Sequence, residues 1–355
     1  MNSELGLDLR HLLADVLELD GPERLPSAPS MHNIPEWDSF AHVALLHAVE
    51  TVFGVALPPE DIERTLSLTE LEHLIIDRRA GKAGGQSQVL PAPLAELWES
   101  LWRDTTLAED GLIYVHSRSG PLLRATGSGL SAFIEQLRGP AGQRTLAFPA
   151  FSFSSRSYPE YLRTRPLFSV RDTPPRTGLL PARAMNMAEA RRSAHPLLSD
   201  LALGPRAETL VATAHLEAAP FHAGSVPAKL VEGRAHVLGL GVDIATNAFI
   251  HWADDAVRER LPFPLYLPEP VGFEIEHADG RRERRAYLAY DPAMTRRIKP
   301  RALRPFFAER PDILVEADLD GIPFYRLDLA RFLERCGEIA REHLDAGKLP
   351  PWYPD

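Results

Sequence analysis

The 355-residue chain contains a single cysteine, Cys336, and no long hydrophobic run. One cysteine excludes a disulfide framework and a cysteine-rich metal site, and it fits a reducing cytoplasm. Because no stretch approaches the roughly eighteen apolar residues of a membrane span, and because the start of the chain lacks a basic segment followed by an apolar core, neither a membrane span nor an export signal is expected. The formal net charge of −10 argues against nucleic-acid binding.

Several catalytic motifs are also absent. The chain has no G-x-S-x-G elbow, no phosphate-binding P-loop, no G-x-G-x-x-G fingerprint and no H-E-x-x-H zinc motif. Gly239 and Gly241 follow a predicted strand, but the third glycine of a dinucleotide fingerprint is missing. Hydrolase, nucleotide-dependent and zinc-protease functions are therefore unsupported, and no metal site is expected.

The net charge is confined to the first part of the chain. Residues 1–80 contain fifteen acidic and five basic residues, whereas acidic and basic residues balance in the remainder. This pattern is typical of either a solvated acidic surface or a small module that docks on basic partner proteins. A stretch rich in Gly, Ser and Gln is followed by two prolines, and this predicts a linker over 81–91 between domains at 1–80 and 92–355.

The first domain is predicted to be a bundle of four helices. Apolar residues recur at helical spacing over 5–17. A second helix is expected to begin at an N-cap, Asp38, and to end at Gly54. A short turn around 59–64 follows, and Thr69-Glu70-Leu71-Glu72 fits a capping box that opens the last helix.

Ser39 lies at the start of the second predicted helix, where free backbone N–H groups and the helix dipole favour a phosphodiester. On its own this serine is equally typical of a helix cap. The surrounding string I-P-E-W-D-S-F-A-H over 34–42, with Phe40 where leucine is commoner, closely resembles an acyl carrier protein. The resemblance implies 4′-phosphopantetheine on Ser39. It also implies two kinds of partner: a phosphopantetheinyl transferase, and acyl-loading or polyketide- or peptide-synthase-type pathway enzymes.

The second domain alternates strands and helices, which predicts an α/β/α layered fold with a mixed sheet. A hairpin turn is expected at Asp320-Gly321. The predicted strands are Leu112–Ser117, Thr145–Phe151, Thr209–Ala214, His236–Leu240, Gly272–His277, Arg285–Tyr290, Ile313–Ala317 and Pro323–Leu327. Helices are predicted over 93–103, 128–138, 246–259 and 328–345.

One histidine of this domain stands in a catalytic context. His251 shares a predicted helix face with Asn247 and Asp254, directly after a strand, where open α/β folds bind ligands. A histidine beside a carboxylate is suited to general-base catalysis. Asp291, after another strand, is a second candidate partner. The alternatives are a surface ion pair for His251 and a helix cap for Asp291.

Two further groups offer ligand-binding side chains. Arg192, Ser193 and His195 form a basic cluster suited to a pyrophosphate or a carboxylate, although a solvated loop has the same composition. His116 and Ser117 end a predicted strand and offer hydrogen bonds at the same edge of the sheet. Cys336, in the terminal amphipathic helix, is expected to lie in the core.

In order along the chain, these pieces resemble the aminoglycoside 3-N-acetyltransferase family over about 92–345. The resemblance is carried by I-Y-V-H-S at 113–117, T-L-A-F-P-A-F at 145–151, T-G-L-L at 177–180, R-S-A-H-P at 192–196, V-L-G at 237–239 and N-A-F-I-H-W-A-D at 247–254. It implies that His251 is the base toward an acceptor amine and that a carboxylate, best matched by Asp291, orients it. Ala248 and Asp254 replace the family's usual Thr and Glu, so an aminoglycoside acceptor does not follow.

Together the two resemblances imply a cytoplasmic N-acyltransferase of specialised metabolism. It would move an acyl group from a carrier-bound or coenzyme A thioester to a small amine, or load the arm on Ser39 from coenzyme A. Asp254 would assist His251, while His116, Ser117, Arg192 and Ser193 would bind the cofactor and Asn247 and His195 the acceptor. Two alternatives stay open: a carrier and docking protein with an inactive second domain, and an acetyl-coenzyme-A-dependent resistance enzyme with a vestigial carrier.

Overall fold

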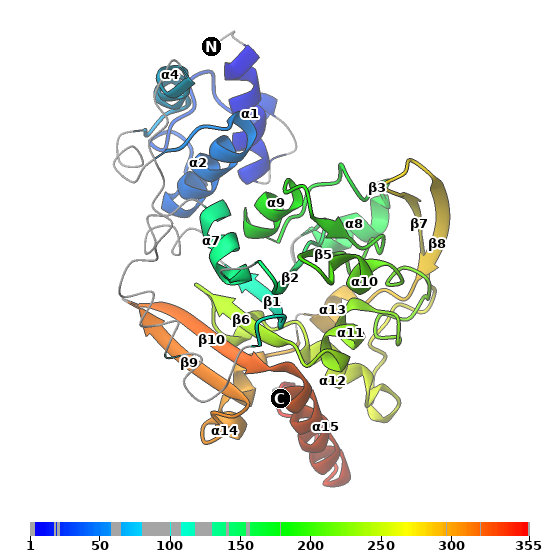
Figure 1. Cartoon of the computed structure of the whole chain (residues 1–355). Coiled ribbons are helices and arrows are strands. Elements are labelled where there is room, and N and C mark those ends of the chain that lie inside the picture. The colour runs from blue at the N-terminus through cyan, green and yellow to red at the C-terminus, as the bar shows by residue number, and fades with distance from the viewer. Residues whose placement is uncertain are drawn as a thin grey trace. The chain divides into compact units, whose positions relative to one another are not determined.

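The computed structural model describes residues 4–17, 19, 22–57, 65–79, 100, 108–117, 130–139, 142–153, 157–177, 179–295, 297–319 and 321–353 (Figure 1). Backbone contacts divide the chain into two units, one of Met1–Pro91 with Ser119–Phe133 and the other of Ala92–Arg118 with Ile134–Asp355. Within the described part of the chain, no helix is long and apolar enough to cross a membrane.

The first unit contains helices α1 (Glu4–Val16), α2 (Ser39–Phe53) and α4 (Leu68–Arg79) and a 3-10 turn, η1 (Pro22–Arg24). Their apolar faces meet in one core. As predicted, Asp38 caps α2 by accepting the N–H of Ala41, and Gly54 ends it with a φ of 63°. The short turn predicted around 59–64 lies outside the described residues, so the four-helix bundle stays a prediction.

The capping box of α4 differs from the expected one. Ser67 Oγ accepts the N–H of Glu70, and the Glu70 carboxylate accepts the N–H of Leu66 and the hydroxyl of Ser67. The box therefore starts two residues before the predicted Thr69. Ser67 offers the same chemistry as Thr69, and its position lets Leu68 and Leu71 be buried on the first turns of the helix.

The second unit is built on a seven-stranded mixed sheet with the order β4-β5-β2-β1-β6-β10-β9. Its centre is parallel: β1 pairs in parallel with β2 and β6, whereas β5 and β10 add antiparallel strands on the two sides. The strands are β1 (Leu112–Ser117), β2 (Thr145–Pro149), β4 (Arg191–Arg192), β5 (Asp200–Leu203), β6 (His236–Leu240), β9 (Leu314–Leu319) and β10 (Ile322–Asp328). The predicted mixed sheet is confirmed.

A smaller sheet and a series of helices complete this unit, and the first residues of α7, 130–133, group with the first unit. The small sheet has the order β3-β7-β8, with bounds Phe168–Ser169, Val271–Glu276 and Arg282–Tyr287. The helices are α7 (Leu130–Arg138), α8 (Tyr158–Thr164), α9 (Leu179–Met185), α10 (Ala207–Val211), α11 (Val226–Glu232), α12 (Ile250–Asp255), α13 (Pro292–Thr295), α14 (Arg304–Phe307) and α15 (Leu329–Asp345), with 3-10 turns η2 (Ile244–Thr246), η3 (Arg258–Arg260) and η4 (Pro300–Leu303).

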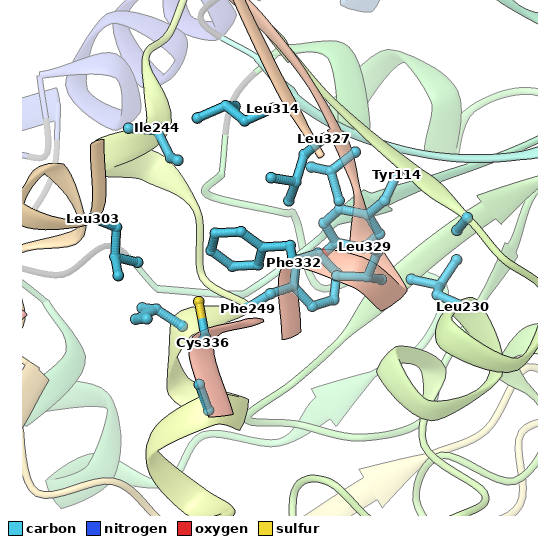
Figure 2. Close-up of a cluster of buried hydrophobic side chains, with 14 of the residues drawn as sticks. Tyr114, Leu230, Ile244, Phe249, Leu303, Leu314, Leu327, Leu329, Phe332 and Cys336 are labelled. Atoms are coloured by element: carbon cyan, nitrogen blue, oxygen red, sulfur yellow. The ribbon is translucent and has the colours of Figure 1, made fainter. Parts of the chain in front are cut away.

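The central strands are buried on both faces. Leu112 and Tyr114 of β1 join a large apolar cluster, drawn in Figure 2, that includes side chains of α12 and α15. Ile113 and Val115, which point to the opposite face because side chains alternate along a strand, are also fully buried. This explains why the strand is a continuous apolar run. Cys336 lies in the same cluster, where burial raises the pKa of its thiol.

One predicted strand is wrong. The segment Thr209–Ala214 overlaps helix α10 and the turn after it. Although the segment is rich in residues that favour strands, its buried side chains are Leu210, Val211 and Ala214, and Ala207 precedes them at the spacing of one helix face. The predicted helix 246–259 is divided into short pieces, and that over 93–103 lies almost entirely outside the described residues.

Candidate active site

His251 lies in the first turn of α12, shortly after the parallel strand β6 ends. Gly241, with a φ of 70°, turns the chain away from the strand. The buried side chain of Asn247 then accepts the N–H of Phe249 through Oδ1, and this bond fixes the start of the helix. The Nδ2 of Asn247 is buried and has no hydrogen-bond partner among the described residues.

The imidazole of His251 is held against a tyrosine. The ring centroids of His251 and Tyr290 are 4.8 Å apart, and the Tyr290 hydroxyl donates to the backbone carbonyl of His251 at 2.7 Å. Burial lowers the pKa of His251 to about 4, so its ring is neutral at pH 7. Nδ1 is buried without a partner in the part of the chain that the structure describes. A neutral imidazole is the form that accepts a proton.

The two predicted carboxylate partners of His251 are engaged elsewhere. Asp254 is fully buried, and its Oδ1 accepts the indole N–H of Trp352 near the end of the chain. Asp291 accepts the N–H of Ala293 at 2.8 Å and so caps α13, as the alternative interpretation predicted. Among the described residues neither carboxylate bonds the ring of His251. Their catalytic roles stay predictions without support from this geometry.

His116 and Ser117 lie beside the end of β6, as their place on β1 predicted. They pair in register with Gly239 and Leu240. The Nδ1 of His116 is 2.9 Å from the hydroxyl of Tyr325 on β10, and burial lowers the pKa of His116 to about 4. The hydroxyl of Ser117 is buried and makes no hydrogen bond to a described residue.

A glycine makes the contact between His116 and Tyr325 possible. A Cβ atom on Gly239 would lie 2.0 Å from Cε1 of Tyr325, so the tyrosine ring crosses β6 only where a side chain is missing. Gly239, one of the two glycines that suggested a nucleotide, therefore has a packing role. Phe249 packs between β1 and α12. Its ring stacks on that of His116, with centroids 6.3 Å apart, and makes an edge-to-face contact with the ring of Tyr114, with centroids 4.9 Å apart.

The basic cluster at β4 is bonded internally. A guanidinium has five N–H donors, and every one on Arg192 is engaged. The acceptors are Ser199, Thr173, Met185, Ala150 and Ser152. The hydroxyl of Ser193 accepts the N–H of Asp200 and donates to Leu198. A pyrophosphate site needs free donors, so this geometry does not support the predicted cofactor role of Arg192 and Ser193.

His195 lies at the small sheet. Its Nδ1 accepts the N–H groups of Leu197 and Leu198, which leaves the ring proton on Nε2. Its ring is 4.2 Å from that of Tyr287 on β8, and Nε2 is buried without a partner among the described residues. Burial, assisted by His222 and His215, lowers the pKa of His195 to about 3. Its contact with an acceptor stays a prediction, as does that of Asn247.

The predicted attachment residue, Ser39, is the first residue of α2. Its side chain lies outside the described part of the chain. The preceding Asp38 is exposed. Modification of Ser39 thus stays a prediction.

Sequence reasoning missed the aromatic residues that hold the site together. Tyr290 is 39 residues from His251 along the chain, Tyr325 is 209 from His116 and Trp352 is 98 from Asp254. Local spacing carries no signal at such separations. The one available hint was Gly239, whose missing side chain indicates that something packs closely on the strand.

Comparison with known proteins gives a consistent family. The sequence model described as aminoglycoside 3-N-acetyltransferase matches residues 115–319. Among solved structures, aminoglycoside acetyltransferase AAC(3)-Xa is similar with a TM-score of 0.53 and 21% identity, covering 72% of this chain and 94% of that one. The YokD protein from Bacillus subtilis is similar with a TM-score of 0.52 and 18% identity, again covering 72% of this chain and 94% of that one. AAC-IIIb, in a binary complex with CoASH, is similar with a TM-score of 0.51 and 21% identity, covering 67% of this chain and 92% of that one. These identities show a shared fold. A search of curated protein sequences gave no match.

Proposed function

Since the chain belongs to the aminoglycoside 3-N-acetyltransferase family and is an N-acyltransferase, we propose that it moves an acyl group from a pantetheine thioester to a small amine with His251 as general base. The observation that carries this proposal is the state of His251: a neutral, half-buried imidazole with an unpartnered Nδ1, placed after a central parallel strand. Ligands of open α/β sheets bind at such strand ends.

The proposed reaction is a direct transfer. The imidazole of His251 takes a proton from the acceptor amine as the nitrogen attacks the thioester carbonyl, so a C–N bond forms and the carbonyl oxygen becomes an oxyanion. The C–S bond then breaks, the carbonyl re-forms, and the thiolate takes the proton back from the imidazolium. Ser117, whose hydroxyl has no partner among the described residues, is our candidate donor to the oxyanion. Cys336 takes no part because its thiol is buried in the core.

The donor is the second part of the proposal. CoASH is bound in the AAC-IIIb complex, and coenzyme A and a carrier protein present the same pantetheine thiol. We therefore propose that the arm is attached to Ser39. Two observations support this: Ser39 begins a 15-residue helix, and the net negative charge of the whole chain lies in its segment. A tethered donor has a raised effective concentration when the linker lets it reach the site.

Intact-mass analysis tests both parts. The chain is incubated with a phosphopantetheinyl transferase and acyl-coenzyme A, and a panel of amines is then added. We expect a pantetheine adduct that is absent in Ser39→Ala, and an acyl group that is lost to the amine in the wild type but retained in His251→Ala. Equal loss of the acyl group from both proteins would contradict the role of His251.

The Ser39→Ala variant separates the carrier from free coenzyme A. If it acylates the amine from free acyl-coenzyme A as fast as the modified wild type, the chain is an enzyme that uses coenzyme A directly and the carrier proposal is wrong. A large loss of rate in Ser39→Ala, with its second unit folded, supports the tethered donor.

A further inference from the structure

Three side chains that could bind a metal ion, two from one hairpin and one from a separate loop, meet beside the small sheet. His277 follows β7, Glu283 lies on β8, and His215 lies in the loop between α10 and α11. Their ligand atoms are all within 4.8 Å of one another. Glu283 Oε1 is 2.8 Å from His277 Nε2 and 3.7 Å from His215 Nε2. In a tetrahedral zinc site with bonds of about 2.0–2.2 Å, neighbouring ligand atoms lie roughly 3.3 Å apart, a spacing between these two distances.

His215 has no other use in the described structure. Neither of its ring nitrogens makes a hydrogen bond to a described residue, and Nδ1 is buried. A half-buried ring with two unused nitrogens beside a carboxylate is an unusual arrangement, because buried polar atoms normally find partners.

The backbone that carries the three ligands is held in place. The Tyr287 hydroxyl on β8 donates to the carbonyl of His215 at 3.0 Å, and the N–H of Leu288 donates to Ala218 at 3.0 Å. The other two ligands belong to one hairpin, in which the N–H of His277 donates to Arg281 at 2.8 Å. Ligands on a fixed backbone lose little conformational freedom when they bind an ion.

From this donor set we propose that His215, His277 and Glu283 form a zinc site that takes water at its remaining position. Two imidazoles and one carboxylate suit Zn²⁺, whereas Mg²⁺ and Ca²⁺ prefer oxygen ligands. The site leaves no spacing motif in the sequence, because its ligands span 69 positions, from 215 to 283.

Two arginines limit the affinity of the site. Arg281 is 3.5 Å from Oε2 of Glu283 and Arg285 is 3.1 Å from Oε1. Both guanidinium groups therefore neutralise part of the negative charge of the Glu283 carboxylate. The same positive charges oppose a cation. The side chain of Arg281 is the more exposed of the two, and its removal should strengthen zinc binding.

The ion would fasten the loop that carries His215 to the β7–β8 hairpin. In the same loop Phe221 stacks on Trp252 with ring centroids 5.8 Å apart. Trp252 is next to His251. Zinc binding would therefore stabilise a segment that packs against the helix of the proposed base.

Titration of the full-length chain, without a histidine tag, with Zn²⁺ against a chromophoric chelator tests the proposal. We expect one equivalent of zinc to bind. The variants His215→Ala and His277→Ala should each lose about a hundredfold or more in affinity, because second-shell changes alone cost up to that much. His73→Ala, at an exposed histidine of α4, should bind as the wild type does, and Arg281→Gln should bind several-fold more tightly.

The outcome is independent of acyl transfer, because the measurement is zinc affinity. Circular dichroism without zinc checks that each variant is folded. Absence of zinc binding at micromolar concentrations, or equal affinity in the wild type and folded His215→Ala and His277→Ala, would overturn the site. Loss of affinity on His73→Ala would place the ion elsewhere and would also overturn it.

Discussion

The β4–β5 hairpin and the segment from Asn247 to Asp254 make an instructive pair. Both combine histidine with polar neighbours beside a strand of the same sheet. In the hairpin, the donors of Arg192 and the hydroxyl of Ser193 are bonded within the protein, and of its histidine, His195, only Nε2 is buried without a partner among the described residues. In the other segment, Asn247 Nδ2 and His251 Nδ1 are buried without a partner among the described residues. Unsatisfied buried polar groups reduce stability, and proteins retain them where function requires them.

Perturbed ionisation alone does not separate the two regions. Burial raises the pKa of Asp200 in the hairpin to about 7, even though Tyr114 donates to its carboxylate at 2.7 Å. It lowers that of His251 to about 4. Both groups are shifted by desolvation, yet only His251 has an unused polar atom. Hydrogen-bond satisfaction therefore separates Asp200 from His251, whereas His195 resembles His251 in having one buried ring nitrogen without a partner among the described residues.

The largest expected effect is that of His251→Ala on catalysis. Loss of a general base typically lowers kcat by about 10² to 10⁴-fold. We expect a decrease in that range and a melting temperature close to that of the wild type, because the ring makes no hydrogen bond to a described residue. Steady-state kinetics with an acyl thioester and amine provide the measurement. His343→Ala on α15 is the matched control. An equal decrease in kcat in this variant would contradict a specific role of His251.

Arg192→Met should have the opposite effect to His251→Ala: stability should fall while kcat stays the same. It leaves the carbonyl of Ala150 and the hydroxyl of Ser199 without their charged donor, and each buried acceptor left unsatisfied costs about 1–3 kcal/mol. We therefore expect a large decrease in the free energy of unfolding and an unchanged kcat per folded molecule. Urea unfolding and active-site-normalised kinetics check the two quantities. A folded Arg192→Met variant with a greatly reduced kcat would show that Arg192 takes part in the reaction.

The central sheet was predictable because burial on two faces leaves a direct trace in the sequence. Leu112–Ser117 and His236–Leu240 were predicted with the bounds that the structure has. β5 was not predicted, because its four residues include the charged Asp200, which is more typical of a loop. The structure buries this carboxylate in the strand, where the Tyr114 hydroxyl donates a hydrogen bond to it. Thr209–Ala214 was misassigned because β-branched residues there lie on a short helix, where tertiary packing overrides propensity.

The site was predictable only where its residues are close in sequence. Asn247 and His251 were predicted as part of one site because they are four residues apart and both follow the end of the same strand. The partner of Asp254, Trp352, is 98 residues away and left no local signal, whereas the bond between Asp291 and Ala293 is a local helix cap that the sequence already offered as an alternative. The zinc ligands were hidden for the same reason as Trp352.

Gly239→Ala probes β6, the strand that precedes Asn247 and His251 in the chain. The added methyl group would overlap the buried ring of Tyr325, and overpacking of this kind costs about 1–3 kcal/mol. Gly272→Ala on β7 is the matched control, because its Cβ would meet nothing within 4 Å. We expect denaturant unfolding to show a loss for Gly239→Ala only. Equal stability of both variants would mean that Tyr325 is free to move away from His116.

The smallest expected effect is the pH dependence of Asp254→Asn. Asp254 is on the helix of His251; its Oδ1 accepts from Trp352, and its Oδ2 is buried without a partner among the described residues. Burial raises the pKa of Asp254 from 3.8 to about 7 in the folded state, so folding favours the protonated acid. The stabilisation is complete below the unfolded pKa and is lost as pH rises toward 7, with a slope of at most about 1.4 kcal/mol per pH unit.

Asparagine keeps the acceptor for Trp352 but does not titrate, so Asp254→Asn should flatten this slope. Urea unfolding at pH 5, 6, 7 and 8 measures it, and Glu309→Gln, at an exposed carboxylate, should keep the slope of the wild type. We also expect the kcat of Asp254→Asn to stay near that of the wild type. If kcat falls as far as in His251→Ala, Asp254 acts with the base, and its bond to Trp352 must open during the reaction.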